Sequence, residues 1–325
     1  MLSKKVVTHG VTFTVMQDSK DQKTSPHQFS NQIEFTQSMK SSKENSAGKT
    51  KDDKEITYML STGEIKYEFG RLLNSGMIGF AYIARSSHTL SEYPMLYCVK
   101  RMLGKLISEK NLFTPLKREI IILGKIQEIK GCVKLVDVLR DVDGLGLVMP
   151  YYPAGDLSRF IKTVRPRARC LPESVARTLF TQLVRTFQEL HGAGIVHRDL
   201  KLENILVEVE DGRGQSDPSV IEKCPEKIKL YLSDFGFAIT LKELHEQSAY
   251  QAVGTPTYLP YEMLTRSTAN GKNGIYYTES VDIWCLGVLL YQILYATTPF
   301  MSEPFDREAT KNLIRQLKYG FPKSP

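Results

Sequence analysis

The stretch that most constrains this chain is IVHRDLKLENILV, at residues 195–207. It places three polar side chains of different chemistry, Asp199, Lys201 and Asn204, between apolar flanks. A carboxylate can orient a hydroxyl nucleophile, an ammonium group can offset charge on a moving phosphoryl group, and an amide oxygen can bind a metal ion. A polar turn after a helix would not require these types in this order, so the stretch predicts a phosphoryl-transfer loop.

The order of the elements predicts two different lobes. From residue 65, aromatic and β-branched runs separated by turn residues predict strands, and a helix is expected to come next with Thr114 as N-cap and Pro115 in its first turn. A second helix, ending at Gly192 as C-cap, has apolar residues at every fourth position: Val175, Leu179, Leu183 and Phe187. Strands followed by helices indicate an α+β fold, with a β-rich lobe joined to a helical lobe.

Residues 1–62 differ in composition from the rest of the chain. They are rich in Ser, Thr, Lys and Gln, cannot bury much apolar surface, and are expected to form a disordered or weakly ordered N-terminal extension. An alternating piece at residues 11–17 is compatible with a strand. The N-terminus has no long apolar core, which argues against a signal peptide.

Charge and cysteine usage argue against several classes. Lys and Arg outnumber Asp and Glu by 43 to 36, a net charge of +7, but no nucleic-acid module is recognisable, so binding of nucleic acid through the basic N-terminal region would rest on charge alone. The five cysteines form no CxxC pair and fit a reducing, intracellular location, cytoplasmic or nuclear. The most apolar stretch, residues 283–291, is too short to span a bilayer, so no membrane partner is expected.

A second polar element, SDFGFA at residues 233–238, lies further along the chain than the first. With HRDLKLEN it resembles the signature set of the eukaryotic protein kinases, and the lysine two residues after Asp199 is similar to the serine/threonine type. The run looks closest to the calcium/calmodulin-kinase and AGC-like branches. The resemblance implies that Asp199 orients the substrate hydroxyl and that Lys201 offsets phosphate charge. Asp234 and Asn204 would hold Mg²⁺ at the phosphates of ATP.

The resemblance also assigns an ion pair. YCVKR at residues 97–101 resembles the kinase strand whose lysine, here Lys100, holds the α- and β-phosphates, with Cys98 where the family usually has alanine. Glu119 lies on the next expected helix among apolar neighbours, and a carboxylate on a core-facing helix requires a cation. We therefore predict that Lys100 pairs with Glu119.

The remaining nucleotide contacts are implied in the same way. GRLLNSGMIGFAYIA at residues 70–84 resembles the glycine-rich hairpin that covers the phosphates. Asn74 stands where the family has its first glycine and Ala81 where it has the valine over adenine, so a weakened ATP affinity is expected. GLVMPYYPAGDL resembles the hinge between the lobes. The implied nucleotide-binding residues are Leu73, Gly76, Gly79, Ala81, Cys98, Lys100, Met149, Tyr152, Asp156 and Leu206.

Asp156 has two interpretations. It stands where a family carboxylate often meets the ribose hydroxyls, but an acid at a helix N-terminus explains it nearly as well. Together with Glu203 it also matches positions that often recognise basic residues upstream of the target hydroxyl. A basophilic substrate preference is therefore expected.

The stretch VGTPTYLPYEML at residues 253–264 resembles the end of the activation segment. Asp282 resembles the buried aspartate that caps the backbone of the catalytic loop from a central helix. Arg198 would pair with an activation-loop phosphate; alternatively no phosphate is needed, since Gln251 stands at a position commonly occupied by phosphothreonine. Candidate phosphate acceptors are Ser248, Tyr250 and Thr255.

The resemblance implies a two-lobed protein kinase domain over residues 63–325. Its N-lobe, 63–149, would hold an antiparallel sheet with one main helix, and its mainly helical C-lobe, 150–325, would contain a surface insert at 208–227. The C-lobe lacks its expected last helices, which would leave an apolar face of the 281–295 helix open to a regulatory protein. The expected function is ATP- and Mg²⁺-dependent transfer of the γ-phosphate to Ser or Thr hydroxyls of protein substrates. The alternative is a catalytically impaired, pseudokinase-like scaffold or a truncated fragment.

Overall fold

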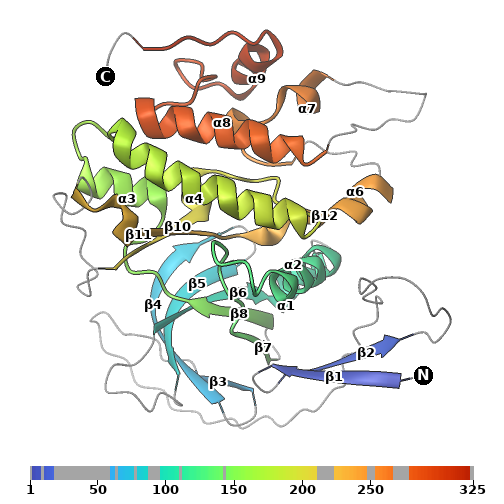
Figure 1. Cartoon of the computed structure of the whole chain (residues 1–325). Coiled ribbons are helices and arrows are strands. Elements are labelled where there is room, and N and C mark those ends of the chain that lie inside the picture. The colour runs from blue at the N-terminus through green and yellow to red at the C-terminus, as the bar shows by residue number, and fades with distance from the viewer. Residues whose placement is uncertain are drawn as a thin grey trace. The chain divides into compact units, whose positions relative to one another are not determined.

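A computed structural model describes the chain over residues 2–8, 11–17, 59–62, 65–76, 79–86, 96–109, 112–141, 144–210, 223–246, 253–265 and 278–322 (Figure 1). Its contacts divide the chain into two compact units. Unit 1 comprises Met1–Ile107 and Val136–Pro150, and unit 2 comprises Ser108–Leu135 and Tyr151–Pro325.

Unit 1 is built on an antiparallel sheet of six strands in the order β3-β4-β5-β6-β8-β7. A separate antiparallel pair, β1 and β2, confirms the strand suggested at residues 11–17 and shows, with β3, that the extension expected to be weakly ordered contains strands. A short helix, α1, comes after β6. The bounds are β1 Leu2–Thr8, β2 Val11–Gln17, β3 Met59–Thr62, β4 Ile65–Ser75, β5 Gly79–Ser86, β6 Leu96–Leu103, α1 Gly104–Glu109, β7 Asp137–Asp141 and β8 Gly144–Pro150.

One face of this sheet forms the core of unit 1. Side chains that alternate along the strands meet in a single buried cluster, as the period of two in a strand requires. Most of its members are β-branched or aromatic, which suits a pleated and half-buried surface. The cluster consists of Tyr67, Phe69, Ala84, Val99, Leu139 and Val148.

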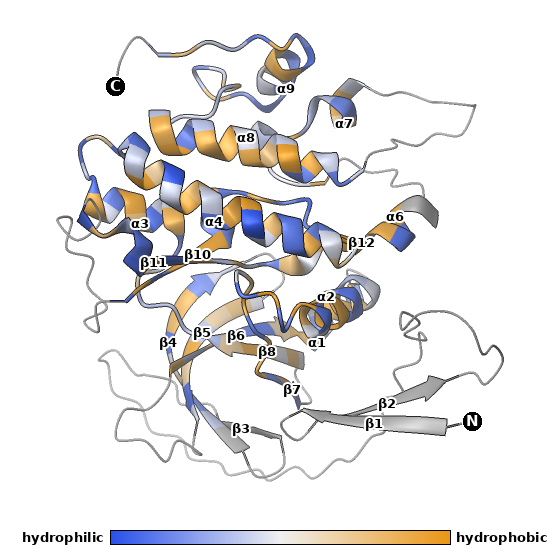
Figure 2. Cartoon of the chain, in the orientation of Figure 1, coloured by the Kyte–Doolittle hydropathy of each residue, from blue (hydrophilic) through white to orange (hydrophobic). Residues whose placement is uncertain are grey.

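Unit 2 is mainly helical. Its longest helices, α4 and α8, pack on one another, and both carry strongly apolar positions (Figure 2). Short antiparallel pairs, β10 with β11 and β9 with β12, lie around the predicted phosphoryl-transfer loop. The helices are α2 Phe113–Lys125, α3 Leu157–Val164, α4 Glu173–Gly192, α6 Leu241–Glu246, α7 Tyr261–Thr265, α8 Ser280–Tyr295 and α9 Arg307–Arg315. The strands and 3₁₀ turns are β9 Ile195–Val196, η1 Leu202–Asn204, β10 Ile205–Val209, η2 Pro225–Lys227, β11 Ile228–Leu232, η3 Phe235–Phe237, β12 Ile239–Thr240 and η4 Pro256–Tyr258.

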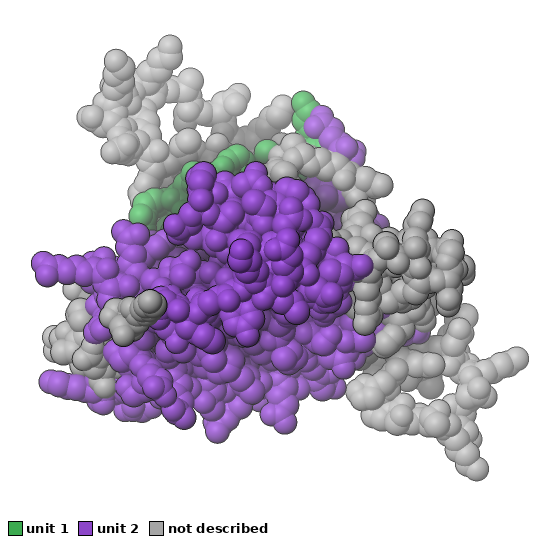
Figure 3. Space-filling view, turned by 90° about the horizontal axis from the view of Figure 1, so that it is seen from above, with its two compact units in different colours: residues 1–107, 136–150 green, residues 108–135, 151–325 purple. Residues whose placement is uncertain are grey.

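The two units together confirm the predicted α+β fold class. Contacts group residues 108–135, and with them helix α2, with unit 2, although the sequence places this segment in the N-lobe. The reason lies in packing, since α2 contacts η3 and β12 of the same unit. Figure 3 colours unit 1 green and unit 2 purple.

Two predicted helix caps are wrong. The N-cap of helix α2 is Leu112, two residues before the expected Thr114, so Thr114 lies inside the helix and no side chain caps it. Pro115 does occupy the first turn. Helix α4 includes Gly192 instead of ending before it. Its last turn tightens because Ala193 N donates to the carbonyls of residues 189 and 190. The left-handed residue that follows the helix is Gly194, with φ of 71°. The predicted buried face of α4 is confirmed at Val175, Leu179, Leu183 and Phe187.

The apolar face of α8 is more covered than expected. Trp284 stacks on Phe300 with ring centroids 5.5 Å apart, and Tyr291 donates to the carbonyl of Gly320. Ile283 of α8 is nevertheless 57% exposed, and further large exposed side chains lie on the segment after α9, with Tyr319 58% and Phe321 66% exposed. In the part of the chain that the structure describes, no helix combines the length and the apolar character needed to cross a membrane.

Candidate active site

The centre of the site is the carboxylate of Asp199, which is only 4% exposed. Its Oδ2 accepts hydrogen bonds from Lys201 Nζ at 3.0 Å and from Asn204 Nδ2 at 3.0 Å. Asn204 Nδ2 also donates to the carbonyl of Asp199 at 2.7 Å. The three polar residues that the sequence singled out therefore form one hydrogen-bonded group, with the carboxylate held by charge-assisted bonds.

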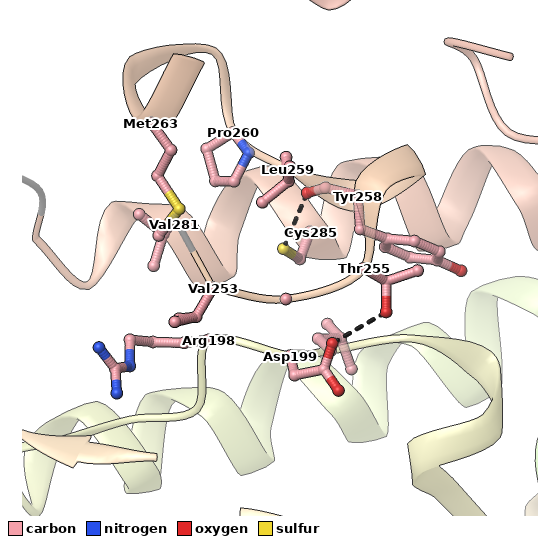
Figure 4. Close-up of a pocket in the computed structure, with 12 residues that line it drawn as sticks. Arg198, Asp199, Val253, Thr255, Tyr258, Leu259, Pro260, Met263, Val281 and Cys285 are labelled. Atoms are coloured by element: carbon pink, nitrogen blue, oxygen red, sulfur yellow. Dashed lines mark hydrogen bonds between the residues drawn. The ribbon is translucent and has the colours of Figure 1, made fainter. Parts of the chain in front are cut away.

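Thr255 completes this group, although its sequence context indicated only a phosphate acceptor. Its Oγ1 donates to Asp199 Oδ1 at 2.9 Å (Figure 4). The same oxygen accepts from Lys201 Nζ at 3.3 Å. The sequence feature that could have pointed to Thr255 is the glycine before it. Gly254 has φ of 110°, and a Cβ there would lie 2.8 Å from the carbonyl oxygen of Arg198. The backbone can approach the catalytic loop this closely only at a glycine, and this fixes the next residue against Asp199.

The segment that carries Thr255 is anchored to α8. Cys285 Sγ lies 3.3 Å from the carbonyl oxygen of Tyr258 (Figure 4). The Tyr258 hydroxyl donates to Gln292. Burial raises the pKa of the Cys285 thiol well above its ordinary value, so the thiol remains a neutral donor. These contacts hold η4, and with it Thr255, in place.

Asp282 confirms the predicted cap on the loop backbone. It is fully buried, and its two oxygens accept from Arg198 N at 2.8 Å and His197 N at 2.9 Å. His191 Nε2 also lies 2.9 Å from Oδ2. Buried backbone donors need such partners, because an unpaired one is costly. Asp282 therefore positions the backbone from which Asp199 projects.

His197 links the catalytic loop to the segment that precedes Asp234. Asp199 N donates to His197 Nδ1 at 3.3 Å, so Nε2 carries the ring proton and donates to the carbonyl of Ser233 at 3.0 Å. The ring of Phe235 packs edge-on against this imidazole, with centroids 5.0 Å apart. Ser233 also donates from both N and Oγ to the carbonyl of Asn204. These contacts tie the two polar elements of the sequence together.

Asp234 and Glu119 border the same glycine. A Cβ added at Gly236 would lie 3.4 Å from Asp234 Oδ1 and 3.7 Å from Glu119 Oε2. Asp234 itself adopts a left-handed backbone, with φ of 59°, and its side chain is exposed. Glu119 is only 5% exposed. Two carboxylates that approach one glycine favour a cation near them, which fits the predicted roles of both residues.

The glycine-rich hairpin is confirmed as β4 and β5 of unit 1. Gly76 N donates to the carbonyl of Gly79 at 2.8 Å across the turn. Asn74, which stands where the family has a glycine, lies in β4 and pairs with Ala81, so it has an extended backbone. Leu73 also lies on β4, half-buried. The position of the missing glycine is therefore an ordinary strand position. The Oδ1 of Asn74 accepts a hydrogen bond from Ser75 N at 2.8 Å.

Lys100 and Cys98 lie on the central strand β6. Cys98 pairs with Met149 on one side and Ile83 on the other, while Lys100 pairs with Ala81 and Leu147. Burial raises the pKa of the Cys98 thiol to about 11. Lys100 belongs to unit 1 and Glu119 to unit 2, so their ion pair stays a prediction.

The remaining predicted nucleotide residues lie in unit 2. Leu206 on β10 forms a bridge with Asp156, and Tyr152 is buried with its ring 4.6 Å from that of Tyr231. Asp156 is the N-cap of α3, since its Oδ1 accepts from Arg159 N at 2.8 Å. The interpretation of Asp156 as a helix N-terminal acid is thus confirmed, and its contact with a nucleotide stays a prediction.

The structure describes only part of the segment in which Arg198 was predicted to pair with an activation-loop phosphate. Arg198 has φ of 68° and donates from Nε to the carbonyl of Phe237 at 2.7 Å. Ser248, Tyr250 and Gln251 lie outside the described residues, as does most of the 208–227 insert. Glu262, in the stretch that resembles the end of the activation segment, accepts a hydrogen bond from Ser280 Oγ at 3.4 Å.

Comparison with known proteins agrees with this geometry. A family model described as the protein kinase domain matches residues 67–322. The chain is 36% identical over 234 residues to serine/threonine-protein kinase ULK3 of Rattus norvegicus, which covers 72% of this chain and 42% of that protein. It is 30% identical over 236 residues to CBL-interacting serine/threonine-protein kinase 13 of Arabidopsis thaliana, covering 72% of this chain and 40% of that protein. With Aurora kinase C of Mus musculus it shares 28% identity over 258 residues, or 79% of each chain.

The chain belongs to the protein kinase family, and the resemblance to serine/threonine kinases is confirmed by these relatives. It spans about two-fifths of the length of the ULK3 and CBL-interacting relatives. The calcium/calmodulin-kinase or AGC-like branch stays a prediction. Membership implies the use of ATP and Mg²⁺, protein substrates and a two-lobed fold.

The residues present fit a magnesium ion. Asn204 uses its Nδ2 to bind Asp199, which leaves Oδ1 as a ligand, and Asp234 supplies a carboxylate. Both are the oxygen donors that Mg²⁺ prefers. Within the described ranges, no three His, Cys, Asp or Glu side chains gather into a metal site. Asn204 and Asp234 would supply two ligands and leave the other positions to phosphate oxygens and water.

Proposed function

We propose that this chain is an ATP- and Mg²⁺-dependent protein kinase domain that transfers the γ-phosphate to Ser or Thr hydroxyls of protein substrates. The observation that carries this proposal is the group around Asp199, in which Lys201, Asn204 and Thr255 all bind one buried carboxylate. A loop of purely structural function has no need for a carboxylate, an ammonium group and an amide held in this way.

Each residue has a role that follows from its contacts. Asp199 orients the substrate hydroxyl and accepts its proton, and Lys201, bound to Asp199 Oδ2, offsets charge on the transferred group. Asn204 and Asp234 would hold Mg²⁺, which when bound screens the charge of the phosphates. Lys100 and the β4–β5 hairpin would bind those phosphates. Adenine and ribose would contact Leu73, Ala81, Cys98, Met149, Tyr152, Asp156 and Leu206.

The test is transfer of labelled γ-phosphate from ATP to a mixed Ser/Thr protein substrate. We expect Asp199→Asn to lower incorporation by about 10²- to 10⁴-fold, the usual contribution of a positioned base. Asp234→Asn should also lower incorporation strongly, because it removes a charged ligand of Mg²⁺. Glu226→Gln is a matched control, because it removes one exposed carboxylate outside the site. Thermal unfolding of each variant separates lost chemistry from lost folding. Equal incorporation by the native chain and Asp234→Asn would favour the alternative of a pseudokinase-like scaffold.

Two further proposals concern the surroundings of the enzyme. An intracellular location, cytoplasmic or nuclear, is supported by five cysteines that are all free thiols. Imaging of a fluorescent fusion tests this location, and secretion of the fusion would contradict it.

A regulatory protein at the C-lobe face is supported by the exposed rings of Tyr319 and Phe321. A partner that co-purifies equally with the native chain and with Tyr319→Ser/Phe321→Ser would contradict this surface.

A further inference from the structure

Helix α3 and the catalytic loop border an open surface hollow of about 400 Å³. Helix α3 contacts η1, which carries Glu203 between Leu202 and Asn204, so one wall of the hollow belongs to the catalytic loop itself. The lining residues are Asp156, Ser158, Arg159, Lys162, Thr163 and Glu203. A group bound here would lie close to the substrate hydroxyl at Asp199.

The hollow is lined by two positive and two negative side chains, which differ in the hydrogen bonds they already make. Asp156 Oδ1 is engaged as the cap of α3. Across the described ranges, the side chains of Arg159, Lys162 and Glu203 have no hydrogen-bond or ion-pair partner. Arg159 and Lys162 are three residues apart on one helix and therefore share a face. Two cations without a partner thus face one carboxylate without a partner, Glu203, and a second, Asp156, whose charge is partly offset by the N-terminus of α3.

The positive charge continues beyond the hollow. Residues 157–170 contain five Lys or Arg and no Asp or Glu. Arg167 and Arg169, in the loop after α3, are exposed, and Arg169 N donates to the carbonyl of Arg165, which keeps this loop compact. A run of one sign along a surface attracts ligands of the opposite sign.

We propose that this hollow binds an anionic side chain of the protein substrate, either an acidic or a phosphorylated residue near the acceptor. The inference rests on the proposed kinase function and names its substrate class. It is the opposite of the basophilic preference expected from the sequence, which stays a prediction that the same peptides test. The guanidinium of Arg159 can bind a carboxylate or phosphate through two parallel hydrogen bonds, with Lys162 as a second charge.

Binding can be measured without catalysis. Fluorescent peptides carry Ala in place of the acceptor and, at successive neighbouring positions, Ala, Arg, Glu or phosphoserine. Fluorescence anisotropy should show that phosphoserine, and more weakly Glu, tightens binding by about tenfold at one position, because charge-assisted bonds are stronger than neutral ones. Arg159→Ala/Lys162→Ala should abolish the difference. Arg177→Ala is the matched control, because it removes an exposed arginine from α4, and it should keep the difference.

The same peptides with a Ser acceptor give the second readout. The ratio of kcat/KM between anionic and neutral peptides should exceed one for the native chain and fall to about one in Arg159→Ala/Lys162→Ala, mainly through KM. A preference for Arg peptides, or a ratio unchanged in the double variant, overturns the inference. If no peptide is phosphorylated but anionic peptides still bind through Arg159 and Lys162, the proposed kinase function fails and the anion site stands. Tightening by phosphoserine without any by Glu assigns the site to phosphorylated substrates.

Discussion

The β4–β5 hairpin and the catalytic loop hold their residues by different kinds of contact. In the hairpin, Asn74 and Ala81 are joined by the antiparallel ladder, which uses main-chain groups. In the catalytic loop, Asp199 is held by the side chains of Lys201 and Thr255. A ladder tolerates any side chain that accepts an extended backbone, whereas a side-chain network depends on the identity of every member.

This difference explains where the chain departs from the family pattern. The departures at Asn74 and Ala81 fall in the ladder, while the catalytic loop keeps the full set of polar residues. The comparison predicts large effects from single changes around the loop, and small effects in the hairpin except where its backbone touches another strand.

The largest effect is expected at Asp282. Asp282→Ala leaves the backbone N–H groups of His197 and Arg198 without their acceptor in a buried site, and each unsatisfied donor costs about 1–3 kcal/mol. Urea unfolding should therefore show a loss of several kcal/mol. Glu279→Ala removes a nearby carboxylate that makes no cap hydrogen bond and should change stability little. Equal losses in the two variants would show that the loop does not depend on this cap.

The hairpin offers a matched pair of glycines. A Cβ at Gly79 would lie 1.9 Å from the carbonyl oxygen of Arg101, whereas the nearest atom to a Cβ at Gly76 is 3.7 Å away. We expect Gly79→Ala to lower the free energy of unfolding by about 1–3 kcal/mol, the usual cost of overpacking, and Gly76→Ala to be nearly neutral. Chemical denaturation of both variants measures this. If Gly76→Ala proved the more damaging, the hairpin would depend on the conformation of its turn instead of on strand contact.

A smaller and purely functional effect is expected at Thr255. Thr255→Ala removes the hydroxyl that joins Asp199 to Lys201, and the loss of about 1 kcal/mol per hydrogen bond should lower kcat roughly 5- to 30-fold. Thr255→Ser keeps the hydroxyl and should restore most of the activity. Steady-state kinetics with one peptide substrate decides the matter. A serine variant as slow as the alanine variant would assign the residue a packing role instead.

The smallest effect is expected at the hairpin side chains. Ala81→Val restores methyl groups and should tighten ATP binding by up to about fivefold, since the added contact is worth roughly 1 kcal/mol. Asn74→Gly should add nothing, because Asn74 is already extended and glycine weakens a strand by about 0.5–1 kcal/mol. Titration calorimetry with ATP compares the two changes alone and together. An unchanged Kd for Ala81→Val would show that this departure is neutral.

Much of the candidate site could be predicted from sequence because its members are close together in the chain. Asp199, Lys201 and Asn204 share one loop, and the hydrogen bonds among them follow from that short spacing. Thr255 could not be found in this way, since it lies 56 residues from Asp199 and meets it only because a glycine lets the backbone approach. The caps at Thr114 and Gly192 were missed because packing and the tightening of the last turn moved the helix ends.

By itself, the sequence determined the fold class, the kinase family and the polar residues of the catalytic loop, because these depend on residue type, order and local period. Only the tertiary structure decided which of these residues are committed to other partners. Asp156 Oδ1 accepts the N-cap hydrogen bond of α3, whereas the side chains of Arg159 and Lys162 in the same hollow have no hydrogen-bond partner among the described residues. The physical reason is that the charge available to a ligand is what remains after the fold has satisfied its own backbone donors and acceptors.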